Sequence, residues 1–214
     1  GFSQTNVYQE TFETDANGTN YNTSIAEFSD GANDYFIRTD GSDIAGNVAI
    51  NNIEGSFFFG AQDIDGEGAT LPVTLTTAQI DVTGLSNLDL AVLLAEDADG
   101  SSLDWDPDDY VHFTYTLDGG APQNLLWIEA DIDSGFNSNA AIDTDFDGVG
   151  DGQVLTDALT EFSAGFDVSG ASTLEIQVEF QLDSGDEDIA IDNLRVVDGF
   201  TASPSLTVQS PADG

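Results

Sequence analysis

The feature that most constrains the fold is a two-residue alternation of apolar and polar side chains in short segments of the chain. The alternation is clearest at 173–182 (TLEIQVEFQL), and it recurs at 7–13 (VYQETFE). Successive side chains of a strand point to opposite faces of a sheet, so this period predicts strands that are buried on one face. No window sustains the 3.6-residue period of an amphipathic helix. The chain is therefore expected to be all-β.

Further strands are predicted where short runs rich in β-branched or aromatic residues end at Gly, Asp or Asn. They are 35–39, 47–53, 56–62, 71–82, 88–96, 110–117, 124–130 and 189–197, while 153–162 is either a strand or a short helix. Segment 56–62 (SFFFGAQ) is apolar enough to predict burial on both faces, and Asp118-Gly119-Gly120 predicts a hairpin turn. Roughly ten short strands indicate one jelly-roll β-sandwich over residues 5–199.

The composition of the chain ends favours an exported protein. Residues 200–214 (FTASPSLTVQSPADG) are rich in Pro and Ser and are expected to be a linker into a further module. The chain opens on Gly1, which suggests a mature segment after removal of a signal peptide. It contains no Cys, so disulfides and thiol chemistry are excluded, and no apolar run is long enough to span a membrane. The expected location is secreted, extracellular or at the cell surface.

The charge balance is extreme, because 41 Asp and Glu face only Arg38 and Arg195, for a formal net charge of −39. Repulsion on this scale opposes a compact fold unless cations offset it, and bound Ca²⁺ or a salty medium would do so. Nucleic acids and anionic membranes are disfavoured as partners, because almost no cation is present to replace their counterions. Neutral glycans, cationic surfaces and anionic glycans bridged by calcium are the partners that remain.

The densest acidic motif is segment 143–152 (DTDFDGVGDG). Hard oxygen donors at positions 1, 3 and 5, a turn at 6 and a backbone carbonyl at 7 are the first half of a calcium loop. The ligands predicted by this spacing are Asp143, Asp145, Asp147, the carbonyl of Val149, and Asp151. Position 12 is Val154 in place of a bidentate Glu, which excludes a complete EF-hand, and the missing ligand is expected from Asp131, Asp133 or a neighbouring loop. The segment resembles loops of thrombospondin type-3 and dockerin-like repeats; the alternative is a solvated Asp/Gly turn.

Two shorter motifs repeat the same theme. Asp63 and Asp65 precede Gly66, and Asp97 and Asp99 precede Gly100, so each pair is either part of a metal site or a plain turn. If successive strands run antiparallel, alternate loops lie at the same end of the sandwich. Loops 40–45, 63–69, 97–109, 131–152 and 183–187 would then form one acidic end that requires metal.

Three stretches in order along the chain resemble the MAM and carbohydrate-binding-module jelly rolls, which are concanavalin-like sandwiches. They are 11–13 (TFE), 34–38 (DYFIR) and 188–194 (DIAIDNL). In those families a Glu after an N-terminal aromatic residue and an Asp in the last strand hold a structural calcium. The resemblance therefore implies Glu13, Asp34 and Asp192 as ligands here. Phrases such as ETFETDANGT and GDEDIAIDNL also resemble jelly-roll modules of secreted multidomain proteins of marine Bacteroidetes, which implies an accessory role.

The sequence gives no support for catalysis. The single histidine, His112, lies in an alternating strand, and neither a G-x-S-x-G elbow, a zinc spacing nor a nucleotide-binding loop is present. Carboxylate pairs are too numerous to indicate a glycosidase. The chain is therefore expected not to be an enzyme.

Aromatic residues in polar loops suggest a ligand surface. Trp105 lies among acids at 103–109, where it would either stack on a sugar ring or fold back as a lid over the sandwich end. Tyr21, in the polar segment 14–33, is a second candidate, whereas Tyr110 and Trp127 are expected to be core strand residues. The sequence predicts a non-catalytic calcium-binding module for glycan binding, surface attachment or cell adhesion. The alternatives are a structural spacer of an adhesin or filament, and an accessory domain of a secreted hydrolase or nuclease.

Overall fold

The computed structural model describes residues 4–46, 48–97 and 105–199. In this part of the chain every regular element is a β-strand, and no helix is long and apolar enough to cross a membrane. The strands are β1 (Thr5–Glu10), β2 (Tyr21–Thr23), β3 (Phe28–Ser29), β4 (Tyr35–Thr39), β5 (Phe58–Gln62), β6 (Val73–Thr77), β7 (Ile80–Asp81), β8 (Asn87–Ala95), β9 (Tyr110–Leu117), β10 (Gln123–Ala130), β11 (Ala140–Asp143), β12 (Thr160–Asp167), β13 (Thr173–Gln181) and β14 (Asp188–Asp198).

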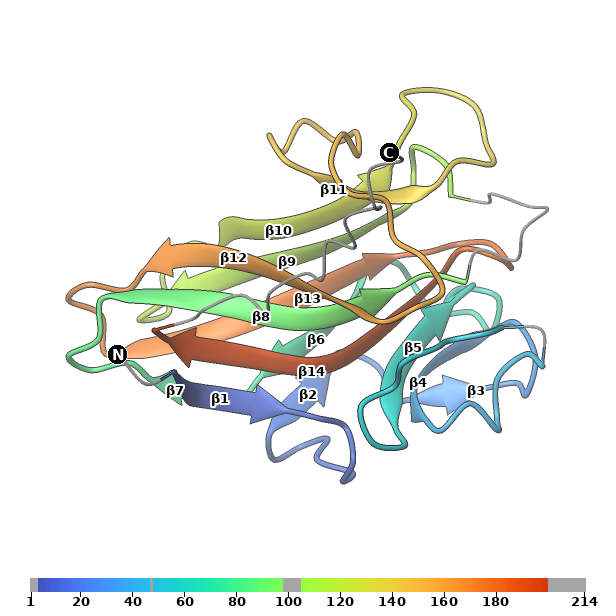
Figure 1. The fold of residues 1–214 in the computed structure, drawn as a ribbon. Coiled ribbons are helices and arrows are strands. Elements are labelled where there is room, and N and C mark those ends of the chain that lie inside the picture. The colour runs from blue at the N-terminus through green and yellow to red at the C-terminus, as the bar shows by residue number, and fades with distance from the viewer. Residues whose placement is uncertain (1–3, 47, 98–104, 200–214) are drawn as a thin grey trace, which may run out of the picture.

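The strands form two antiparallel sheets that pack face to face (Figure 1). Sheet A has the order β12-β8-β14-β5-β4-β3, with β1 also paired to β14. Sheet B has the order β11-β10-β9-β13-β6-β2, with β7 also paired to β13. The prediction of an all-β jelly-roll sandwich is confirmed.

Aromatic side chains from both sheets fill the space between them. Phe36 and Phe59 of sheet A lie 4.9 Å apart between ring centroids, and Phe180 of sheet B lies 5.3 Å from Phe36. Phe12 joins this cluster at 5.7 Å from Phe59. The edge-to-face pairs that Phe36 makes with Phe59 and Phe180 add to the free energy gained by burying the rings.

A second apolar layer covers the outer face of sheet A. Tyr35, Phe58 and Leu93 point to this face and pack with Ile44, against which the segment 48–53 also lies. Burial on both faces is therefore confirmed for β5, in which all five residues are buried. The predicted strand 47–53 is wrong over its described part, where one bridge, from Asn51 to Ala158, is the only pairing. The apolar side chains of this segment cover the outer face of sheet A, and the segment adds no strand to the sheet.

Among the described residues, no such apolar layer covers the middle strands of sheet B on its outer face. The residues of β13 alternate between buried and half-exposed along the whole strand, and those of β9 do so over its first half. This alternation leaves a row of polar and aromatic side chains facing outward from the sheet. The fold therefore presents one covered and one open sheet face.

Most long strands begin and end within two residues of their predicted bounds. Strands β4 and β9 match the predicted ranges, and the hairpin after Leu117 has the expected turn, in which Asp118 and Gly119 both adopt positive φ. The predicted strand 71–82 is interrupted and forms β6 and β7, both paired to β13. Segment 153–162 is irregular until β12 begins at Thr160. The short strands β2, β3 and β11 were not predicted, and the predicted linker 200–214 lies outside the described residues.

Candidate functional site

The acidic segment 143–152 follows β11 and folds back over the edge of sheet B. The backbone N–H of Gly150 donates to the carbonyl of Ala130 at 2.8 Å. A Cβ atom at Gly150 would lie 2.8 Å from both the carbonyl oxygen of Glu129 and the Cβ of Ala141, so only glycine permits this approach. The segment is thus attached to the two outermost strands, β10 and β11.

Within this segment Asp143, Asp145 and Asp147 place carboxylate oxygens within 4.8 Å of one another. Asp143 is buried and accepts hydrogen bonds from the backbone N–H groups of Asp145, Phe146 and Gly148. The negative charge of Asp147 is the largest cause of the raised pKa of the Asp145 carboxyl. The three acids repel one another, and their carboxylates lie close enough together to bind one cation.

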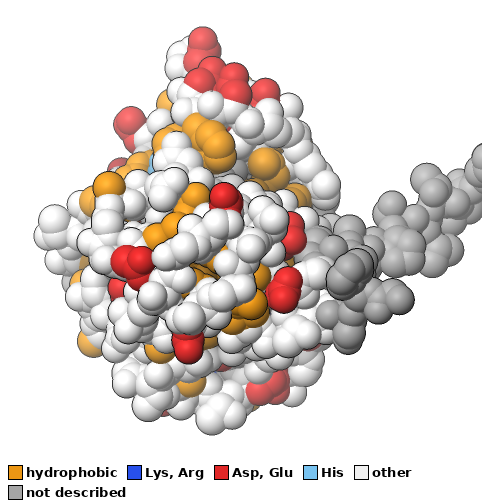
Figure 2. Space-filling model, turned by 90° about the vertical axis from the view of Figure 1, so that its left-hand side faces the viewer, with side chains coloured by type: hydrophobic (Ala, Val, Ile, Leu, Met, Phe, Trp, Pro, Cys, Tyr) orange, Lys and Arg blue, Asp and Glu red, His pale blue; other side chains and the backbone are white. Residues whose placement is uncertain are grey.

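The other predicted ligands of this segment border a hollow of about 490 Å³. Asp147, Val149 and Asp151 form one side of it, and Asp131 and Asp133 form the other. Asp151 itself accepts hydrogen bonds from the backbone and hydroxyl of Thr144, which lower the pKa of its carboxyl. In the end-on view of Figure 2, acidic side chains gather at the top of the molecule, where Figure 1 places β11 and its neighbouring loops.

Two substitutions separate the structural and the metal-binding contributions of this segment. Asp143→Ala is expected to lower the free energy of unfolding by about 1–3 kcal/mol even in EDTA, because three backbone donors lose their acceptor. Asp147→Ala is expected to lower it in calcium but to change it little in EDTA, because the relief of repulsion offsets the loss of one exposed hydrogen bond from the backbone N–H of Val149. Urea unfolding of both variants in both buffers measures this. An Asp147→Ala variant as stable as the parent in calcium would argue against a metal here.

A row of aromatic rings lies directly beside this segment on the open face of sheet B. Trp127 on β10 and His112 on β9 are paired residues whose rings stack at 3.8 Å, and His112 stacks on Tyr110 at 4.0 Å. Phe146, from the middle of the acidic segment, meets Trp127 edge-on at 5.3 Å and is 38% exposed. We call these four residues, Tyr110, His112, Trp127 and Phe146, the aromatic row.

Hydrogen-bonding side chains continue the same face across the sheet. His112 Nε2 lies 2.5 Å from the carboxylate of Glu129, and the Tyr110 hydroxyl donates to Glu179 at 2.9 Å. Further along, Thr76, Thr116, Pro122, Glu175 and Gln177 line a hollow of about 240 Å³. The face therefore combines aromatic rings with hydroxyl, amide and carboxylate groups.

The sequence analysis placed Tyr110 and Trp127 in the core, and this is wrong. Val111 and Phe113 are fully buried between the sheets. Because side chains alternate along β9, Tyr110 and His112 must point to the outer face of sheet B. The signal was present in the order of residues 110–113. Tyr110 and Trp127 were assigned to the core because they are large aromatic residues within predicted strands.

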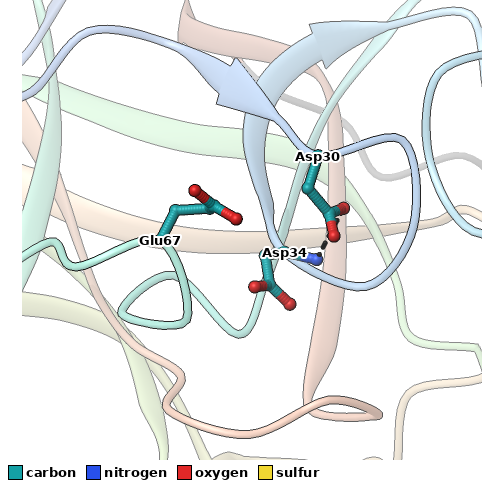
Figure 3. A group of neighbouring side chains, drawn as sticks. All are labelled: Asp30, Asp34 and Glu67. Carbon is teal, nitrogen blue, oxygen red and sulfur yellow. Dashed lines mark hydrogen bonds between the residues drawn. The ribbon is translucent and has the colours of Figure 1, made fainter.

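At the end of the sandwich where β5 ends and β14 begins, acids from separate loops meet. Asp30, Asp34 and Glu67 place carboxylate oxygens within 4.8 Å of one another (Figure 3), and Asp30 accepts hydrogen bonds from the backbone of Ala32 and Asp34. Burial, followed by the charges of Asp34 and of Asp65, raises the pKa of Asp63 to about 6. Of the ligands implied by the MAM-like resemblance, Asp34 thus groups with this set.

Asp97 lies deeper at the same end. Its backbone N–H donates to Asp188 Oδ1 at 3.0 Å, and burial is the main cause of the strongly raised pKa of Asp188. Asp99, the other predicted ligand of that motif, lies outside the described residues.

Glu13 and Asp192 lie near each other elsewhere on sheet A. Asp192 is fully buried and accepts from the backbone of Glu54, and burial is the largest cause that raises its pKa to about 6, with smaller effects from Glu54 and Glu13. Glu13 is exposed and accepts from the backbone N–H groups of Ser56 and Phe57. Both carboxylates therefore already bind backbone donors.

The two predicted sugar-stacking residues are not available for stacking. Trp105 and Tyr21 are both 0% exposed. The carbonyl of Trp105 accepts from the backbone and hydroxyl of Ser138, which hold the residue against the core, as in the lid alternative. Tyr21 packs edge-on against Phe12 at 5.6 Å between the sheets. The polar residues that flank Trp105 and Tyr21 in the sequence therefore did not indicate that the two side chains are exposed.

No protein-family model and no curated protein matches this chain. Among solved structures, the xylan-binding domain of Xyn10C from Paenibacillus barcinonensis superposes with a TM-score of 0.46 at 10% identity, covering 92% of this chain and 96% of that one. A cleaved adhesin domain of Lys-gingipain from Porphyromonas gingivalis gives 0.48 at 15% identity, covering 92% and 100%. The mannan-recognising carbohydrate-binding module TmCBM27 gives 0.40 at 15% identity, covering 92% and 98%. At such identities these likenesses carry no binding residue over to this chain.

Proposed function

We propose that this chain is a non-catalytic, calcium-dependent module that attaches a secreted or cell-surface protein to a neutral polysaccharide. The observation that carries the proposal is the open face of sheet B, where the aromatic row adjoins the hollow lined by Glu175 and Gln177. Attachment to a surface glycan also accounts for cell adhesion as its role.

The chemistry of this face suits an uncharged sugar chain. Carboxylate and amide oxygens of Glu175 and Gln177 accept hydrogen bonds from sugar hydroxyls, and the Gln177 amide and the Thr116 hydroxyl donate them. Ring edges and faces of the aromatic row offer apolar contact to the C–H surfaces of a sugar. An anionic polymer is disfavoured, because the chain carries a net charge of −39.

The proposed dependence on calcium arises from the acidic segment 143–152, which carries Phe146. Asp143, Asp145 and Asp147 are proposed to bind Ca²⁺ together with the carbonyl of Val149, and Phe146 lies between the first two of these acids and the third. An ion that relieves their repulsion would keep Phe146 against Trp127 and so complete the aromatic row. Glu13, Asp34, Asp63, Asp65, Asp97 and Asp192 remain predicted ligands of further ions.

The proposal is tested by affinity electrophoresis and calorimetry against a panel of neutral polysaccharides, in calcium and in EDTA. The parent is expected to bind at least one polymer, more tightly in calcium. Gln177→Ala and Trp127→Ala are each expected to weaken the affinity by roughly tenfold or more, which corresponds to loss of about 1.4 kcal/mol. Trp127 fluorescence provides a second readout of binding.

Ser163→Ala is the matched control, because Ser163 is an exposed strand residue of β12 in the other sheet. It is expected to bind like the parent. A parent chain that binds nothing across the panel would refute glycan attachment and favour a spacer of an adhesin or filament. Equal binding by the parent and a folded Gln177→Ala variant would place the ligand elsewhere.

A further inference from the structure

A third group of acids, which the calcium motifs of the sequence do not include, lies at the junction of the two sheets. Asp106 and Asp109 belong to the turn that leads into β9 of sheet B, and Glu187 immediately precedes β14 of sheet A. Their carboxylate oxygens lie within 4.8 Å of one another. Asp109 is 1% exposed and Glu187 is 4% exposed, so these two acids are shielded from water, whereas Asp106 is half-exposed.

The hydrogen bonds of the group leave one buried oxygen without a donor. Asp109 Oδ2 accepts from the backbone N–H of Asp106 at 2.7 Å, and Glu187 Oε2 accepts from the backbone of Asp183 and Ser184. Asp109 Oδ1 is buried, and none of the residues that the structure describes donates a hydrogen bond to it. A buried carboxylate oxygen without a partner is costly, and such atoms are uncommon unless an ion or water binds them.

No cationic side chain can neutralise the group. The chain has two Lys or Arg residues in total. Arg38 donates to the carbonyl of Glu13, and Arg195 pairs with Glu161. The compensating charge must therefore come from solution, either as a proton or as a metal ion.

A shared proton would satisfy only part of this requirement. Burial, followed by the contact with Glu187, raises the pKa of Asp109 to about 9, so one proton would bridge these two residues at neutral pH if no ion were bound. The surroundings are acidic as well, since the pKa of Asp183 is raised by burial and by the charges of Asp65, Asp106 and Asp108. A divalent cation would satisfy three carboxylates at once and offset more of this charge.

We propose that Asp106, Asp109 and Glu187 bind a Ca²⁺ ion that joins the two sheets at this end of the sandwich. All the donors are hard carboxylate oxygens, which Ca²⁺ prefers, and it completes its six to eight ligands with water or backbone carbonyls. The ion would fix the start of β9 to the start of β14. This site is independent of polysaccharide binding and of the Asp143 segment.

The test compares the parent with Asp109→Asn by calcium calorimetry and by thermal unfolding in calcium and in EDTA. Asparagine keeps the shape of the side chain but removes its charge. Asp109→Asn is expected to bind one calcium ion fewer, and to lose roughly 5–10 °C of the rise in Tm that calcium gives the parent. In EDTA its Tm is expected to equal or exceed that of the parent, which excludes a folding defect as the cause.

Asp108→Asn is the matched control, because Asp108 is exposed, carries the same charge and lies one residue away, outside the group. It is expected to keep the full number of calcium ions. The proposal is overturned if Asp109→Asn binds as many ions as the parent and keeps the full rise in Tm, which would leave a shared proton as the explanation. Loss of polysaccharide binding with calcium stoichiometry intact would bear on the proposed function alone.

Discussion

Removal of calcium at low ionic strength is expected to lower the Tm of this chain by roughly 5–10 °C for each occupied site. A site at 100 times its Kd contributes about 2.7 kcal/mol, and about 1 kcal/mol changes Tm by 2–4 °C in a domain of this size. The physical cause is repulsion among 41 acids that two arginines cannot offset. Buried or clustered acids such as Asp109 and Asp143 should account for most of the effect.

Thermal unfolding followed by circular dichroism, in calcium and after chelation, measures this effect. Sodium chloride added to the chelated protein is the control, because it screens exposed charges but does not replace a coordinated ion. We expect salt to restore only part of the lost Tm. An EDTA melt that coincides with the calcium melt at low salt would contradict every metal site proposed for this protein.

Without calcium, the chain is expected to become more stable as the pH is lowered from about 9 to about 5. The pKa of Asp109 is raised to about 9, and the pKa values of Asp63 and Asp192 to about 6, in each case mainly by burial. The unfolded value is about 3.9, so the folded chain binds more protons in this range. The stability gained is complete below the unfolded pKa and is lost as the pH rises through the folded pKa of each group.

Calcium is expected to reverse this dependence above about pH 5. Bound ions favour the ionised carboxylates, so protons compete with calcium and stability then falls as the pH falls. Urea unfolding at a series of pH values, with calcium and with EDTA, gives the two profiles. Parallel profiles would show that the acids with raised pKa values are not the groups that bind calcium.

The local alternation of apolar and polar residues was sufficient to predict most strands of the sandwich. In β9 and β13 an apolar side chain at every second position can be buried only on one face of a sheet, so strand type and inward face follow from order alone. Residues 48–53 show the limit of this reasoning. Val48, Ile50 and Ile53 have strand-like composition but cover the outer face of sheet A, because a sheet between two apolar layers needs covering side chains as well as partner strands.

The candidate sites also differ in how far the local sequence predicted them. The clustering of Asp143, Asp145 and Asp147 was predictable, because these acids are close in sequence and follow the spacing of a calcium-loop motif. Asp109 and Glu187 are far apart in sequence. The expected strand order placed their loops at one end of the sandwich, but it did not indicate which acids of those loops meet. Trp105 shows the opposite error, since its acidic neighbours suggested exposure while its carbonyl binds Ser138 and its ring is buried.

The sequence by itself determined the class of fold, the period of its strands, the excess of negative charge and one loop with the residue spacing of a calcium motif. These properties depend on the order and composition of neighbouring residues. Only the tertiary structure decided which sheet face stays open, that His112 stacks between Tyr110 and Trp127 on that face, and that acids before β9 and β14 share one buried space. Strand pairing and sheet packing bring distant residues together, and the desolvation that perturbs the buried acids exists only once the sheets have packed.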